Sequence, residues 1–175
     1  MDVAGNVLAT VVRYCPNSKT WRTVKSMHEE RDGPRLISFN DYLYAIGGST
    51  RTIEKYDSSE DEWIIFKDVQ IESHCSSSIA LHNDKIYLLS YSKLEVFDPK
   101  NKTTELMNDF KEIEYGTTLV SYDNKLLAIG GGNFENEKDA TKRIFEFDLI
   151  EQKWNEFKYT MDVPRAYHRS VIVEH

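Results

Sequence analysis

The sequence has 175 residues, with 22 Lys or Arg against 29 Asp or Glu, so its formal net charge is −7. A chain of this length can form one domain with a sizeable core. Its acidic balance disfavours nucleic acid as a partner, because nucleic-acid binders present a basic face. Cys15 and Cys75 have no disulfide-framework or metal spacing, which fits a reducing, cytoplasmic location. We expect no signal peptide and no contact with a membrane.

Short strands are predicted throughout the chain, because runs of β-branched and aromatic residues alternate with turn residues and no sustained helical period occurs. Two strands, 7–14 and 21–26, flank a turn with Pro16 and Asn17, and Met1–Ala4 is a marginal inner strand beside them. Three groups of four follow: 35–39, 42–46, 52–56 and 63–66; 76–81, 85–89, 93–97 and 104–107; 116–122, 125–129, 142–147 and 154–157. Val171–Val173 is predicted as one further strand, an innermost one.

The segment Leu43–Trp63 has a second copy at Leu126–Trp154. In both, an apolar strand ends in a glycine pair, and a tryptophan stands six residues after an aromatic-Asp pair. A degenerate copy between them has Thr104 in place of the tryptophan. Tyr14 and Trp21 belong to an incomplete copy. The spacings are 42, 41 and 50 residues from Trp21 through Trp63 and Thr104 to Trp154. Periods of this size indicate a propeller or a solenoid.

The repeated unit resembles the kelch repeat in the glycine pair that closes its "YAIGG" strand, in its Tyr/Phe-Asp followed by Trp, and in its Met-x-x-x-Arg at Met27 and Met161. The resemblance implies an all-β kelch β-propeller of four-stranded antiparallel blades. We expect a single domain over 1–175, with a partial blade at 1–26, a blade at 27–68, a degenerate blade at 69–109, a blade at 110–160 and a closing innermost strand at 161–175. An open, incomplete propeller and a closed four-bladed ring are both compatible with this count.

The signature residues have structural explanations. The glycines permit sharp turns and close backbone approach, and the aromatic residues are spaced to pack between neighbouring blades. These structural positions are Gly47, Gly48, Tyr56, Trp63, Gly130, Gly131, Phe147 and Trp154. Asp57, Asp98 and Asp148 are expected to bind their own turn backbones. Arg31 and Arg165 recur in register, so each either holds a connection between blades or contacts a partner.

We find no catalytic motif, no metal spacing and no cofactor-binding loop, so the chain is predicted not to be an enzyme and to hold no metal or cofactor. Recognition is expected on the loops of the face around the propeller channel, because loops on a rigid scaffold usually carry binding. The candidate partner-binding residues are Arg31, Arg35, Ser49, Arg51, His74, Tyr91, Tyr115, Asn133, Phe134, Arg165, Tyr167 and His168.

The C-terminal segment is similar to that of BTB-kelch proteins, in which it supplies the innermost strand of the blade begun at the start of the array. This resemblance implies a protein-interaction module, namely the target-binding region of a cullin ubiquitin-ligase adaptor in the ubiquitin-like conjugation pathway. Cullin would be met only through BTB and BACK regions, which we expect this chain to lack. Alternatives are an actin-binding kelch protein, a free-standing short kelch protein such as large DNA viruses encode, and a galactose-oxidase-type propeller enzyme, for which no matching copper cluster is found.

Overall fold

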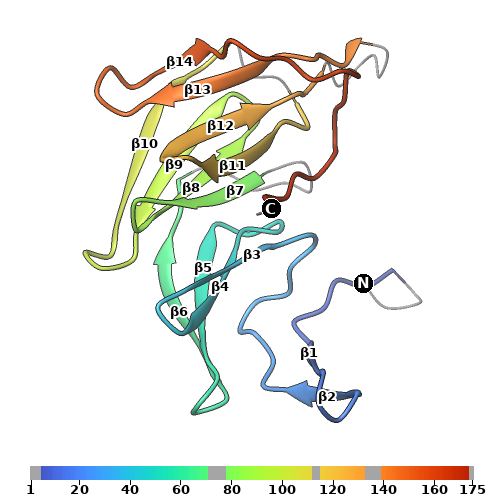
Figure 1. Ribbon diagram of the computed structural model, residues 1–175. Coiled ribbons are helices and arrows are strands. Elements are labelled where there is room, and N and C mark those ends of the chain that lie inside the picture. The colour runs from blue at the N-terminus through green and yellow to red at the C-terminus, as the bar shows by residue number, and fades with distance from the viewer. Residues whose placement is uncertain (1–4, 71–77, 112–114, 133–138, 174–175) are drawn as a thin grey trace. The chain divides into compact units, whose positions relative to one another are not determined.

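The computed structural model describes residues 5–70, 78–111, 115–132 and 139–173. The regular elements of these ranges are antiparallel strands, which confirms the predicted all-β class. Two compact units, Met1–Cys75 and Ser76–His175, divide the chain and are described separately (Figure 1). That the whole chain acts as one domain stays a prediction.

Unit 1 contains a two-stranded and a four-stranded sheet (Figure 1). The first blade is β1 (Val11–Cys15) and β2 (Thr20–Val24), paired from Val11 opposite Val24 to Cys15 opposite Thr20. The second blade follows chain order and consists of β3 (Arg35–Phe39), β4 (Tyr42–Ile46), β5 (Thr52–Asp57) and β6 (Glu62–Asp68). The first blade therefore has the outer pair of strands of a kelch blade.

Unit 2 contains two four-stranded sheets in which each strand pairs with its neighbour in the chain. The third blade consists of β7 (Ser78–His82), β8 (Lys85–Ser90), β9 (Lys93–Asp98) and β10 (Thr103–Asp109). The fourth blade consists of β11 (Thr118–Tyr122), β12 (Lys125–Ile129), β13 (Ile144–Asp148) and β14 (Lys153–Glu156). β7 and β11 lie side by side, and Leu119 N donates a hydrogen bond of 2.9 Å to Ser78 Oγ.

Tight hairpins begin the three four-stranded blades. Each joins the first two strands through a two-residue Asn-Asp or Asp-Asn turn in which both residues have a positive φ, 47° and 65° at Asn40 and Asp41. Positive φ at both central residues defines the type I′ turn, whose twist matches that of antiparallel strands. The same sequence signal therefore fixes the register of the inner strands in each blade.

The glycine pairs are required by geometry. Gly48 has φ +79°, and a Cβ atom there would lie 2.7 Å from the Pro34 nitrogen. Gly130 has φ +65°, and a Cβ atom there would lie 2.4 Å from the Arg165 carbonyl oxygen. Any larger residue would clash with backbone, so these glycines let the turn after the second strand pack against the connection into an inner strand.

Aromatic pairs form the packing between blades inside each unit. In unit 1 the rings of Tyr56 and Trp63 lie 4.9 Å apart and pack with Val24 and Ala45, and Trp63 Nε1 donates to Lys25 O at 3.0 Å. In unit 2 the rings of Phe147 and Trp154 lie 5.0 Å apart in a cluster that also contains side chains of the third blade. These contacts bury the tryptophans, which are 2% and 7% exposed.

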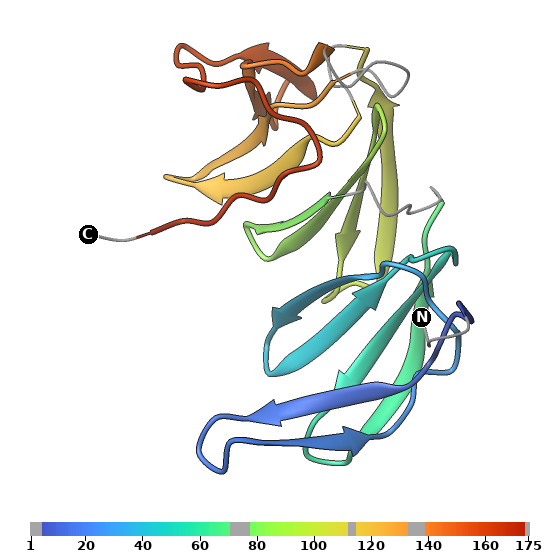
Figure 2. The ribbon, with the colours of Figure 1, turned by 90° about the vertical axis from the view of Figure 1, so that its right-hand side faces the viewer.

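Two strand predictions are wrong. β1 begins at Val11, four residues later than expected, and Leu8 instead forms an isolated bridge with Arg31. Residues 170–173 form no strand, and Val171 is 83% exposed (Figure 2). No described strand lies beside this segment to accept its backbone hydrogen bonds, without which an extended run is no stable strand. The predicted strand at Met1–Ala4 lies outside the described residues.

Candidate functional site

Three connections of unit 2 bring five of the predicted partner-binding residues to one region. Tyr91 follows β8, Tyr115 precedes β11, and Arg165, Tyr167 and His168 lie in the segment after β14. The Tyr91 and Tyr115 rings meet edge to face at 4.6 Å. We call these five residues the tyrosine-arginine site.

Backbone hydrogen bonds hold the connection before β11 and the segment after β14 to the turn after β12, while Tyr91 joins them through its ring contact with Tyr115. Gly132 N donates to Tyr115 O at 2.9 Å, and Tyr167 N donates to Gly116 O at 2.9 Å. Gly131 N donates to Arg165 O at 2.8 Å. Because these bonds join the turn after β12 to the connections on both sides, the segment after β14 is fixed although it forms no strand.

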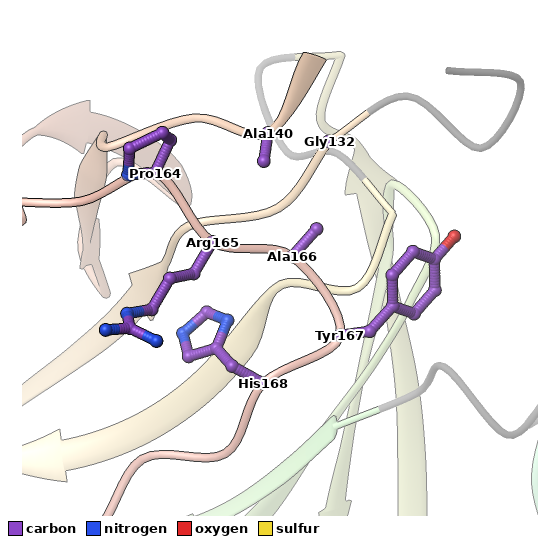
Figure 3. Close-up of a pocket in the computed structure, with 7 residues that line it drawn as sticks. All are labelled: Gly132, Ala140, Pro164, Arg165, Ala166, Tyr167 and His168. Atoms are coloured by element: carbon purple, nitrogen blue, oxygen red, sulfur yellow. The ribbon is translucent and has the colours of Figure 1, made fainter. Parts of the chain in front are cut away.

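A pocket of about 460 Å³ opens at this junction (Figure 3). It is lined by Gly132, Ala140, Pro164, Arg165, Ala166, Tyr167 and His168. Tyr167 has φ +55°, an uncommon backbone conformation for a residue with a side chain. Its ring packs on Gly116, where a Cβ atom would lie 2.9 Å from the ring carbon Cγ. The glycine therefore makes room for the tyrosine at the mouth of the pocket.

The Arg165 guanidinium and the His168 imidazole lie beside each other on one wall (Figure 3). Both ring nitrogens of His168 are shielded from solvent and have no hydrogen-bond partner among the described residues. Burial, reinforced by the positive charges of Arg165 and Arg169, lowers the pKa of His168 below its ordinary value. The ring is therefore neutral at pH 7 and offers one donor and one acceptor nitrogen.

Arg31 has the same motif position as Arg165 and a different environment. Its side chain is buried, and its guanidinium donates to Glu54 Oε1 at 2.9 Å, to Gly47 O at 2.6 Å and to the hydroxyls of Thr50 and Thr52. Arg31 is thus an internal clamp that fixes the turn after the glycine pair. Its assignment as a partner-binding residue is corrected, because a buried guanidinium with these partners cannot reach another protein.

Glu54 is the residue that makes this clamp possible. It is fully buried and also accepts hydrogen bonds from His28 N at 2.7 Å and His28 Nδ1 at 2.9 Å. Burial alone would raise the pKa of Glu54, but the hydrogen bonds from His28 and Arg31 outweigh it and lower the pKa. Glu54 was not among the sequence candidates, although a carboxylate directly after Ile53 in a predicted strand was a detectable signal.

Arg165 differs from Arg31 because, among the described residues, it forms no ion pair with a carboxylate. Its side chain is exposed, and Phe145 of the fourth blade stands where the second blade has Glu54. The exposed guanidinium can therefore pair with a carboxylate of another protein, as Arg31 pairs internally with Glu54.

The other candidates lie in unit 1 or outside the described residues. Arg35, Ser49 and Arg51 belong to unit 1, where Ser49 and Arg51 are exposed in the turn after the glycine pair. His74, Asn133 and Phe134 lie outside the described residues. Sequence reasoning missed Gly116, Gly132 and Ala140, whose signal was only the placing of small residues where connections meet.

Over the described ranges, no group of three or more His, Cys, Asp and Glu side chains is arranged to hold a metal ion. The same residues include no helix with the length and apolar character to cross a bilayer.

Comparison with known proteins agrees with this geometry. Residues 115–158 match the family model described as "Kelch motif". An F-box/kelch-repeat protein of Arabidopsis thaliana is 28% identical over 86% of this chain and 39% of its own length. Kelch repeat and BTB domain-containing protein 2 of Homo sapiens is 26% identical over 64% of this chain and 19% of its own length. The chain thus spans less than half of either relative.

The solved structure titled "Structure of YjhT" superposes with a TM-score of 0.74, covering 91% of this chain and 64% of that chain at 12% sequence identity. At that identity the likeness shows the fold alone. The repeat motif, the relatives and the fold together show that this chain is a region of kelch repeats with the architecture of an incomplete β-propeller.

Proposed function

We propose that this kelch region binds a protein target through the tyrosine-arginine site of unit 2. The observation that carries the proposal is that Arg165, Tyr167 and His168 line one pocket (Figure 3). Tyr115 is bonded to its lining residue Gly132 and meets the Tyr91 ring. The three tyrosines are 37%, 37% and 44% exposed, so each keeps ring surface for a partner. Tyr and Arg dominate the binding energy of protein interfaces when a partner covers them.

The chemistry of the pocket favours a target that presents an acidic side chain. Arg165 supplies an exposed guanidinium fork, and the neutral His168 ring, whose nitrogens are shielded from solvent, lies beside it. A carboxylate entering the pocket would pair with Arg165, while neighbouring apolar groups of the target pack on the tyrosines. Protonation of His168 would add a second positive charge. Because burial lowers the pKa of His168, we expect the affinity for an acidic target to rise only as the pH falls below the ordinary pKa of histidine.

At a finer level, we propose that the protein serves as the target-binding part of a ubiquitin-ligase adaptor in the cytoplasm. The support is the company that kelch repeats keep in the relatives, whose names include an F-box and a BTB domain. On this proposal, the kelch region selects the target and other regions recruit the ligase, so the 175-residue chain alone binds a target without transferring ubiquitin.

The test is affinity capture with matched variants. The chain is immobilised in four forms: unchanged, Arg165→Ala, Tyr115→Ala, and Arg143→Ala as a control. Arg143 is a half-exposed arginine of the same unit that pairs with Glu156 at 3.1 Å and is not among the residues that line the pocket. Captured proteins are identified by mass spectrometry, and the affinity of the strongest is then measured by titration.

We expect one set of proteins to bind the unchanged chain and the Arg143 variant. Each site variant should weaken the titrated affinity by roughly tenfold or more, the usual loss at a central Arg or Tyr of an interface. Equal binding to all four forms would exclude the tyrosine-arginine site as the recognition surface.

A further inference from the structure

An apolar face of the first blade is open to solvent. Side chains alternate along β1, so Val11 points toward the second blade while Val12 and Tyr14 point away, where Tyr14 meets Trp21 of β2 at a ring distance of 5.1 Å. Val12, Tyr14 and Trp21 are 56%, 44% and 68% exposed. We call them the Trp21 face.

The fourth blade has an open face that is hollow. A hollow of about 500 Å³ lies over β12 and the end of β14, lined by the aromatic residues Tyr122, Phe157 and Tyr159 together with Leu127 and charged neighbours. Tyr122 and Tyr159 are 57% and 60% exposed. We call this hollow the Phe157 face.

The two packed interfaces inside the units show how such faces fit. Trp63 of the second blade is covered by Val24, which stands three residues after Trp21 in the first blade. In unit 2 the cluster around Trp154 receives Met107, three residues after Thr104 in the third blade. The residue three positions after the tryptophan position of one blade therefore packs against the tryptophan of the next.

Phe157 stands three residues after Trp154 and so occupies this packing position on the fourth blade. Lys158 likewise corresponds to Lys25, whose carbonyl oxygen accepts the hydrogen bond from Trp63 Nε1. The Phe157 face thus carries the residues that pack against a tryptophan at the interfaces inside the units. Trp21 is the tryptophan that stays exposed.

We propose that two copies of this chain associate head to tail, with the Trp21 face of one copy packed into the Phe157 face of the other. Trp21 is exposed on unit 1, and Tyr122 and Tyr159 are exposed on unit 2. Large exposed apolar patches of this kind mark interaction sites. Because the two faces differ, the contact is heterologous: it closes into a ring if the rotation permits and otherwise extends into longer assemblies.

The test is complementation between two variants, followed by light scattering coupled to size exclusion over a wide range of concentration. Trp21→Glu disables one face and Phe157→Glu disables the other. Ile150→Glu is the control, because Ile150 is 94% exposed in a turn that belongs to neither face. If Phe157→Glu does not fold by circular dichroism, Tyr159→Glu replaces it.

We expect the unchanged chain and the Ile150 variant to gain mass with concentration. Each face variant alone should associate roughly 30-fold or more weakly, as for loss of a central aromatic residue. An equimolar mixture of the two should form a heterodimer and nothing larger, because only one competent pair of faces remains. Any of three results would overturn the proposal: a monomer at every concentration, undiminished association of the Trp21 variant, or no heterodimer in the mixture.

Discussion

Trp63 offers the sharpest test of the packing between the first two blades. The ring is 2% exposed, lies 4.9 Å from Tyr56 and packs with Val24 and Ala45. Trp63→Ala removes these contacts, leaves a cavity and strips the Lys25 carbonyl of its donor. Truncations of this kind cost about 3–5 kcal/mol, and we expect the upper half of that range because a hydrogen bond is lost as well.

Trp21→Ala is the matched control, with the same residue type at the same repeat position. Its ring is 68% exposed, so we expect a loss of less than about 1 kcal/mol when the protein is dilute enough to be monomeric. Urea unfolding is followed by circular dichroism and by hydrogen exchange of unit 1 amides. If both substitutions lower the free energy of unfolding equally, or if neither does, the assignment of Trp63 to an inter-blade core is wrong.

Three further predictions concern the clamp, the turns and the metal content. Glu54→Ala should destabilise unit 1 by about 3–5 kcal/mol in urea, because Arg31 is left buried without its carboxylate; a loss within experimental error would contradict the clamp. The Ser59 side chain donates to Asp57, and turn amides donate to Asp98 and Asp148; these hydrogen bonds lower the pKa of each carboxyl. The three carboxylates should therefore contribute fully to the stability of the fold above the unfolded-state pKa of aspartate. This contribution should be lost as the pH falls through their lower folded-state pKa values. The measurement is the Tm between pH 7 and pH 2 for the unchanged chain and the three Asp→Asn variants, whose Tm should fall less steeply with acid. Protein dialysed against chelator should contain no stoichiometric copper or zinc by elemental analysis, and metal that survives would revive a propeller enzyme.

The sequence predicted the strands well because strand and turn signals are local. Two-residue Asn-Asp turns and glycine pairs depend on the φ values of the residues themselves, so the inner hairpins were found within one or two residues. The strand expected at 170–173 failed because a strand depends on a neighbour that supplies hydrogen bonds. Val171–Val173 has the β-branched composition of a strand but no described partner.

The candidate site was predicted only in part, for a related reason. Arg31 and Arg165 share one motif, and the motif alone could not separate an internal clamp from an exposed guanidinium. The difference comes from Glu54, a buried acid in a strand more than twenty residues away. By contrast, Tyr91, Tyr115 and Tyr167 were chosen for their place in loops. The backbone bonds at Gly116 and Gly132 hold the loops of Tyr115 and Tyr167, and Tyr91 meets Tyr115 through its ring.

Photo-crosslinking tests most directly the central claim that the loops of unit 2 recognise a protein. A benzophenone amino acid is placed at Tyr115, in the tyrosine-arginine site, or at Ile150 as an exposed control. We predict discrete adducts with another protein from position 115 that disappear in the Arg165→Ala background, and none from position 150. Adducts from both positions alike, or adducts at 115 that persist without Arg165, would contradict the account.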